Sequence, residues 1–227
     1  MTKRVFLACF ALFAAGVLMG GEFACQFVAG KWSDNDWILV KSPRWTNIGA
    51  WIQKADCIVN RCPEDATKEE MLGKRAQETY TSMVLKNKVT GNATITTTTS
   101  FDFRMAPEIV IAGPLGADKD GYPEYREHWE IVLYDQGVNV WHHEFRDGKP
   151  FWRKAAFVNA TLEPGKKYTM TAKIQFTQKV PILEVSCGDI CFGCMLPTLP
   201  TEYYAGITAC EGLNSFYDFK LSTPDKK

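Results

Sequence analysis

Short strands dominate the pattern of hydrophobic and polar positions after residue 36. Runs of β-branched and aromatic residues, broken by Gly, Pro, Asn and Asp, recur to the end of the chain, and such runs are typical of antiparallel β-structure. The clearest run, 168–176, alternates apolar residues with Thr, Lys and Gln, which predicts one buried and one solvated face. It follows a tight-turn signal at 163–166. The predicted strands are 37–41, 50–53, 79–88, 94–104, 108–112, 128–135, 138–146, 151–158, 167–176, 182–187, 204–209 and 215–221.

This number of strands in about 200 residues predicts an all-β fold, a two-sheet antiparallel β-sandwich of the jelly-roll type. The only helical candidate, 64–78, is rich in Lys, Glu, Ala and Met but weakly amphipathic, so we expect one short surface helix. A chain of this length can bury one substantial core. We therefore expect an N-terminal targeting segment, 1–24, followed by one sandwich domain, 25–227.

The N-terminus has the features of a secretory signal. Lys3 and Arg4 precede an apolar stretch, 5–19, and small residues follow it. A retained membrane anchor is the alternative, because 5–21 carries no charge and approaches the length of a spanning helix. Ala24-Cys25 is similar to a lipoprotein box, although Glu22 and Phe23 fit that box poorly. We expect a secreted, periplasmic or cell-surface protein, with attachment to the membrane through the N-terminus as the alternative.

The charge balance excludes some partners. The chain has 26 basic and 26 acidic residues, so its formal net charge is zero. Nucleic acids and anionic membrane surfaces are bound by proteins with an excess of positive charge on one face. We therefore expect no nucleic-acid partner.

The eight cysteines of an exported chain predict disulfide bonds, because the compartments beyond the membrane are oxidising. Cys9 would leave with the signal, and lipid attachment at Cys25 would leave an even number to pair. Cys57 with Cys62 is the most local pair. The Cys187-x3-Cys191-x2-Cys194 cluster is similar to a thiolate metal site, but disulfides are the expected state there too.

All three histidines fall within 128–143, in a predicted β-hairpin. Gln136-Gly137 lies between two alternating runs, as a two-residue hairpin loop should. That loop pairs Tyr134 with Asn139, and one face of the hairpin then carries a mixed set of side chains. This face comprises Arg126, His128, Glu130, Tyr134, Asn139, Trp141 and His143, whereas Trp129, Ile131, Leu133, Val138 and Val140 form the core face, with His142 and Glu144 further along.

The mixed face suits a sugar ligand. Aromatic rings stack on the apolar faces of pyranose rings, while carboxylates, amides and imidazoles bind the hydroxyl groups. The alternative is an ordinary solvent face of a sheet, but Trp141 beside ionisable residues favours a binding site in which Arg126, Asn139 and Trp141 contact the substrate. His128, Glu130 and His143 would also suit a metal ion. Their proximity rests on an inferred register, so we expect neither a metal nor another cofactor.

Two types of glycan cleavage fit this face, with Glu130, His128, His143 and Tyr134 as candidate catalytic residues. A glycosidase needs two carboxylates about 5 to 9 Å apart. Glu130 is the best candidate, but its partner is open, because the other nearby acids are distant or predicted on the core side. A lyase needs a base, His128 or His143, with Tyr134 as the acid. Arg126 or Asn139 would then neutralise the uronate carboxylate.

The order of the segments 37–40, 130–135 and 205–220 resembles the concanavalin A-like lectin/glucanase superfamily, including its secreted bacterial branches near the sugar hydrolases. The resemblance implies a jelly roll and a polysaccharide or oligosaccharide ligand. The chain departs from the glucanase pattern Glu-x-Asp-x-(x)-Glu, offering only Glu130 and Asp135. The Gln-x-His and Tyr-x-Lys-x-Gly strands of jelly-roll alginate lyases are also missing, so no catalytic role transfers from the family.

Three functions therefore remain open. A glycan-cleaving hydrolase or lyase is slightly favoured over a non-catalytic, lectin-like carbohydrate-binding module. A structural envelope or adhesion protein is the third, in which Trp45, Trp51 and Trp152 would serve as packing or partner contacts.

Overall fold

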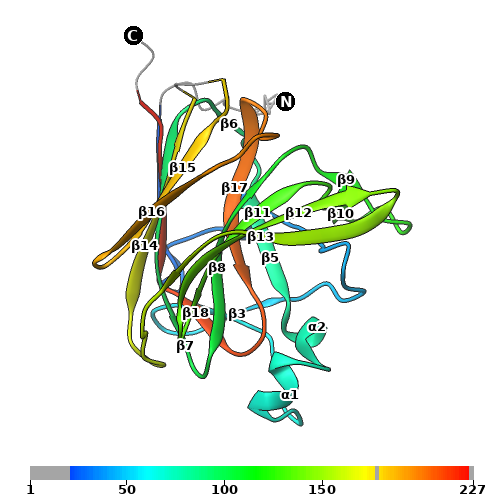
Figure 1. Cartoon of the computed structure of the whole chain (residues 1–227). Coiled ribbons are helices and arrows are strands. Elements are labelled where there is room, and N and C mark those ends of the chain that lie inside the picture. The colour runs from blue at the N-terminus through cyan, green and yellow to red at the C-terminus, as the bar shows by residue number, and fades with distance from the viewer. Residues whose placement is uncertain (1–20, 177–178, 225–227) are drawn as a thin grey trace, which may run out of the picture.

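The computed structural model describes residues 21–176 and 179–224, which fold into two antiparallel β-sheets packed face to face (Figure 1). The predicted two-sheet sandwich is confirmed. Figure 1 shows β14, β15 and β16 on one side of the molecule and β11, β12 and β13 on the other. The described helices are short, and none of them has the length and apolar character needed to cross a membrane.

The first sheet contains the predicted strand 168–176 near its centre, together with strands that the sequence pattern did not predict. Three such strands are β1, β4 and β16, and the predicted segment 215–221 divides into β18 and β19. Across the sheet the order is β16 (Ile190–Met195), β15 (Ile182–Cys187), β14 (Tyr168–Gln175), β7 (Ala93–Phe101), β18 (Asn214–Phe216), β4 (Ile58–Asn60) and β3 (Trp51–Gln53), with β19 (Asp218–Ser222) also on β7 and β1 (Glu22–Gln26) on β19.

The second sheet carries the predicted histidine hairpin as β11 and β12. Its order is β13 (Lys149–Asn159), β12 (Gly137–Arg146), β11 (His128–Tyr134), β8 (Met105–Ala112), β17 (Glu202–Ala209), β5 (Thr81–Leu85) and β2 (Trp37–Leu39), with the short β6 (Val89–Thr90) on β17 and a separate pair formed by β9 (Gly116–Ala117) and β10 (Pro123–Glu124).

The core lies between the sheets, where the alternating apolar residues meet. Met170, Ala172 and Ile174 of β14 are fully buried, as the alternation of 168–176 predicts. The predicted core face of the hairpin is confirmed as well, because Trp129, Ile131, Leu133, Val138 and Val140 are all buried.

The predicted helix 64–78 is two shorter helices, α1 (Lys68–Leu72) and α2 (Ala76–Thr79), at one end of the sandwich (Figure 1). Thr67 and Glu70 form a capping box at the start of α1, and Gly73 ends it. Glycine has the conformational freedom to end a helix and a low propensity to continue one. A 3-10 turn, η1 (Asp34–Asp36), precedes β2.

β1 lies across the predicted domain boundary. It begins at Glu22 and pairs with β19 from Glu22 to Gln26, so residues 22–24 form part of the described sandwich. Cys25 pairs with Phe219, and burial raises the pKa of its thiol to about 12. Residues 1–20, where most of the predicted signal lies, are outside the described residues, and export stays a prediction.

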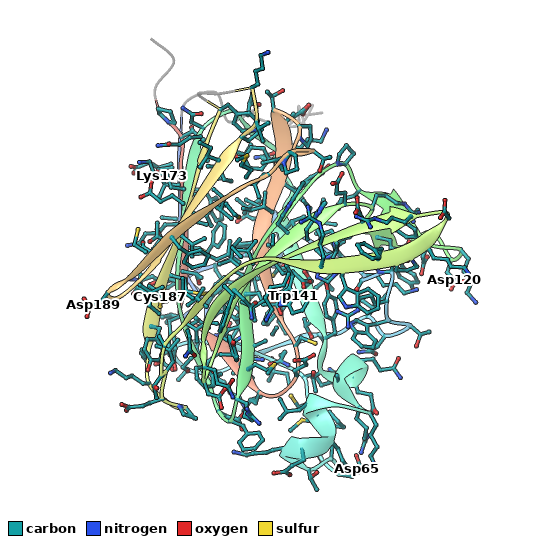
Figure 2. All side chains as sticks on the ribbon, viewed as in Figure 1. Asp65, Asp120, Trp141, Lys173, Cys187 and Asp189 are labelled. Carbon is teal, nitrogen blue, oxygen red and sulfur yellow. The ribbon has the colours of Figure 1, made fainter. Side chains whose placement is uncertain are left out.

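The predicted disulfides are wrong for the described cysteines, which are all unpaired. Cys57 and Cys62 lie on either side of the extended strand β4, in which each residue advances the chain by about 3.3 Å, whereas a disulfide needs Cα atoms about 4.4–6.8 Å apart. Cys191 and Cys194 are three residues apart in β16 and so face opposite sides of the sheet. Asp189 marks the turn after Cys187, at the opposite end of the hairpin from Cys194 (Figure 2).

The register of the histidine hairpin differs from the prediction by two residues. Tyr134 pairs with Gly137 and His128 with His143, so the two-residue loop is Asp135-Gln136. Gly137 belongs to β12, with φ +138°, and a Cβ there would lie 2.0 Å from the carbonyl oxygen of Val158 on β13. The close approach of β13 thus requires this glycine inside the sheet rather than in the loop.

Candidate functional site

A pocket of about 310 Å³ opens on the face of the second sheet that is turned away from the first sheet. β8, β11, β12 and β13 supply most of its lining, and the segments around Arg44 and Glu211 complete it. Trp141 of β12, labelled near the centre of the view in Figure 2, lies at this pocket. The lining combines indole rings with ionisable groups, namely Trp45, Trp141 and Trp152 with Glu108, Glu130, Glu211, His143, Arg44 and Lys154.

Most of the predicted site residues line this pocket despite the changed register. Side chains alternate between faces with a period of two, so a shift of two residues leaves every side chain on its predicted face. Glu130, Tyr134, Asn139, Trp141 and His143 all contribute to the lining.

His128 lies behind the pocket instead of lining it. Its side chain is 1% exposed and stacks between Tyr125 and His143, with ring centroids 4.3 and 4.5 Å away. Burial, helped by the neighbouring His143, lowers the pKa of His128 to about 4, so the ring is neutral at neutral pH. Its Nε2 donates a hydrogen bond of 3.1 Å to Glu130. His128 therefore orients Glu130 and cannot itself reach a ligand.

Arg126 is also outside the lining residues. Its guanidinium pairs with Glu124 at 2.6 Å and donates to the backbone oxygen of Ala117. The side chain thus joins β10 to β9, and its predicted contact with a substrate is not supported by its position.

Glu130 is the buried carboxylate at the centre of the hairpin. Oε1 accepts the hydrogen bond from His128, and Oε2 lies 2.8 Å from Nε2 of His143, at an angle that is poor for a hydrogen bond. Burial alone would raise the pKa of Glu130. The two imidazoles outweigh burial and hold that pKa well below its usual range, so Glu130 is ionised.

Glu108 is a second buried carboxylate beside Glu130, and it comes from β8 rather than from the hairpin. It lies on β8 opposite Val132, which places it diagonally across from Glu130 on the same face of the sheet. The side chain is 4% exposed, and Oε2 has no hydrogen-bond partner among the described residues. Burial and the nearby Glu130 hold the pKa of Glu108 well above its usual range, so the carboxyl keeps its proton.

The sequence held one signal for Glu108. It is the single charged residue in the strand Met-Ala-Pro-Glu-Ile-Val-Ile-Ala, and a charge within a buried strand is rare unless it has a specific role. Its position relative to Glu130 depended on the pairing of β8 with β11, two segments about 20 residues apart in the chain, which no local pattern shows.

His128, Glu130 and His143 place one ligand atom each within 4.8 Å of one another, a spacing that could hold a metal ion. The carboxylate of Glu130 faces both imidazole nitrogens, accepting a hydrogen bond from His128 and lying 2.8 Å from Nε2 of His143, so its two oxygens already have close neighbours. We assign no metal to it. A second set around His142 lies on the other face of the sheet, where His142 stacks on Trp129 and pairs with Glu127 at 2.7 Å.

Comparison with known proteins shows the fold. No family model matches the chain, and no curated protein matches it. A carbohydrate-binding module, CBM66 from Bacillus subtilis, is 12% identical with a TM-score of 0.53 and covers 83% of this chain and 96% of its own. A Lotus tetragonolobus seed lectin is 9% identical with a TM-score of 0.56, over 91% of this chain and 100% of its own.

Peanut lectin, solved with a nonamer peptide, is likewise 9% identical, with a TM-score of 0.53 over 89% of this chain and 97% of its own. At these identities the likeness concerns the fold alone. The predicted lectin-like jelly roll is therefore confirmed as an architecture.

Proposed function

We propose that this protein binds a carbohydrate in the pocket on the second sheet. The composition of the pocket carries the proposal, because three indole rings surround a set of polar groups. Trp45, Trp141 and Trp152 offer flat apolar surfaces for the faces of pyranose rings. The amide of Asn139 and the carboxylate of Glu130 offer partners for sugar hydroxyls, and a few placed polar groups in an aromatic pocket are typical of ligand sites.

The fold gives independent support. Two of the similar solved structures are lectins and one is a carbohydrate-binding module. The argument for this chain still rests on the pocket, because one sandwich fold hosts many functions. Trp45 and Trp152, which a structural role would use as packing or partner contacts, both line the pocket.

Replacing Trp141 with alanine should weaken glycan binding about 5- to 150-fold, because a central aromatic contact contributes about 1–3 kcal/mol. Binding is measured by titration calorimetry after a glycan-array screen. The matched control is Tyr122→Ala, which removes an aromatic side chain that is 53% exposed and lies outside the pocket. A folded wild-type protein that binds nothing on a broad array would point to a structural or adhesion role instead.

Glycan cleavage is a second candidate, favoured by Glu108 and Glu130. Their environments move the two pKa values in opposite directions, which is how paired carboxyls divide into an acid and a base. Diagonal cross-strand neighbours are about 7–8 Å apart, within the spacing of glycosidase carboxyl pairs. Protonated Glu108 would donate its proton to the departing glycosidic oxygen, while ionised Glu130 attacks the anomeric carbon or activates the water that replaces that oxygen.

A lyase remains the alternative chemistry, with His143 as base and Tyr134 as acid, since both line the pocket. A polysaccharide panel, assayed for new reducing ends and for absorbance near 235 nm, separates hydrolysis from elimination. We expect Glu130→Gln and Glu108→Gln to lower hydrolysis by about 10²–10⁴-fold, with Glu184→Gln on β15 as an unaffected control. If a folded sample binds glycan but produces neither new reducing ends nor absorbance near 235 nm, the protein is a non-catalytic binding protein.

A further inference from the structure

Arg44 is a positive charge at the pocket without an acidic partner in the described part of the chain. Its guanidinium carbon lies 4.6 Å from the ring centroid of Trp45 and 4.3 Å from that of Trp152. No carboxylate of the described residues lies within ion-pair distance of it. Arg61 and Arg153 also lack an ion pair among those residues, but neither lines the pocket. Arg75, Arg104, Arg126 and Arg146 all pair with an aspartate or a glutamate.

Lys154 is a second such charge, on the neighbouring edge of the pocket. Its Nζ lies 5.5 Å from the ring centroid of Trp141 and 4.8 Å from that of Phe157, and it too has no ion pair among the described residues. A bulge creates this position, because the pairing of β12 with β13 skips Ala155 and sets Lys154 opposite Trp141. Bulges commonly redirect a side chain toward a binding site.

Contact with an aromatic ring positions these cations and leaves hydrogen-bond donors free. A guanidinium that stacks on a ring keeps the N–H groups along its edge available, and those groups match the two oxygens of a carboxylate or a sulfate. A lysine ammonium likewise retains three donors. Arg44 and Lys154 therefore present donors next to the indole rings on which a sugar would stack.

The acidic residues Glu108 and Glu130 lie deeper in the pocket than the two cations. Glu108 and Glu130 are buried in the sheet, whereas Lys154 is exposed and Arg44 is half-buried. Burial raises the pKa values of Glu211 and Glu108, whereas the two imidazoles hold Glu130 ionised at the floor. An anionic group held at the rim would thus face two cations, with the floor carboxylate behind them.

On the basis of the proposed carbohydrate function, we propose that the ligand is an anionic glycan, whose carboxylate or sulfate groups bind Arg44 and Lys154 while its sugar rings lie on Trp141 and Trp152. The alternative role for Arg44 is to balance the acids at the floor of the pocket, because its charge acts on Glu108 and Glu211. That role would affect stability but would leave ligand preference unchanged.

The test compares matched glycans on the full-length protein. Polygalacturonate is paired with its fully methyl-esterified form, keratan sulfate with its desulfated form, which carries no carboxylate, and neutral laminarin serves as the uncharged reference. The variants are Arg44→Met and Lys154→Met, which keep the apolar stem and remove the charge. Arg153→Met is the matched control, since Arg153 is the exposed neighbour of Lys154 on the opposite face of β13 and does not line the pocket.

We expect binding to an anionic glycan at least about ten-fold tighter than to its neutral partner, in line with the strength of charge-assisted hydrogen bonds. Arg44→Met and Lys154→Met should each reduce that preference about ten-fold, while Arg153→Met leaves it unchanged. Preference for polygalacturonate identifies the carboxylate, and preference for keratan sulfate identifies the sulfate. Equal binding of charged and neutral glycans, or a preference that survives both substitutions, would overturn the inference while leaving carbohydrate binding intact. Failure of all glycans to bind would overturn the proposed function itself.

Discussion

Glu130→Ala should lower the free energy of unfolding by about 2–4 kcal/mol at pH 7, the cost of a buried donor left without its acceptor together with a new cavity. Glu130 is 6% exposed, and it faces His128 and His143 on adjoining positions of the hairpin. Its removal leaves Nε2 of the buried His128 with no acceptor and opens a cavity beneath the pocket. Urea denaturation, followed by tryptophan fluorescence, measures the change.

Two further variants make the Glu130 measurement specific. Glu130→Gln keeps the volume and one acceptor oxygen, so it should cost about 1–2 kcal/mol. Glu184→Ala removes a half-exposed glutamate from β15, beside Lys173, and should stay within about 0.5 kcal/mol of wild type. If Glu130→Ala unfolds at the same urea concentration as Glu184→Ala, Glu130 does not stabilise the hairpin.

Glu108→Gln should stabilise the protein, by an amount that grows with pH. Burial raises the pKa of Glu108, so the folded state holds this proton more tightly than the unfolded chain does. The resulting stability is fully present below the unfolded pKa of about 4.3 and is lost as pH rises toward the folded pKa. Glutamine resembles the protonated carboxyl in shape and has no proton to lose, so the variant escapes this loss.

The gap between Glu108→Gln and wild type should therefore be near zero at pH 4 and widen as pH rises from the unfolded pKa to the folded pKa, with a limiting slope of about 1.4 kcal/mol per pH unit. This slope corresponds to about 3–6 °C in Tm per unit for a domain of this size. Thermal unfolding in a series of buffers from pH 4 to pH 8 measures it, with Glu184→Gln as a control that follows wild type throughout. A gap that stays constant with pH would show that Glu108 is not held protonated by the fold.

The alternation of side chains could be predicted well, because it depends only on local chain geometry. Period-two patterning placed Met170 and Ile174 in the core and Glu130 and Trp141 on the opposite, pocket-lining face of their strands. The exact register of the histidine hairpin could not be predicted from the alternation. Gly137 was predicted in the loop, but it lies inside β12, because β13 approaches too closely there for any larger residue. The predicted pocket residues were still correct, because a shift of two residues leaves each side chain on the same face of the sheet.

The disulfide prediction failed for a reason of geometry. Cysteine counts and an expected oxidising compartment say nothing about the distances between cysteines. The extended strand between Cys57 and Cys62 and the opposite faces of Cys191 and Cys194 keep their thiols apart.

The sequence by itself determined the sandwich, the core face of the histidine hairpin and the mixed character of its other face, because each follows from the period of a single strand or from neighbouring residues. Only the tertiary structure decided that Glu108 lies beside Glu130, that His128 is buried behind it, and that Arg44 and Lys154 border the same pocket. These side chains come from segments far apart along the chain. Their proximity, burial and shifted pKa values arise only when the strands pair, and no local pattern encodes which strands become neighbours.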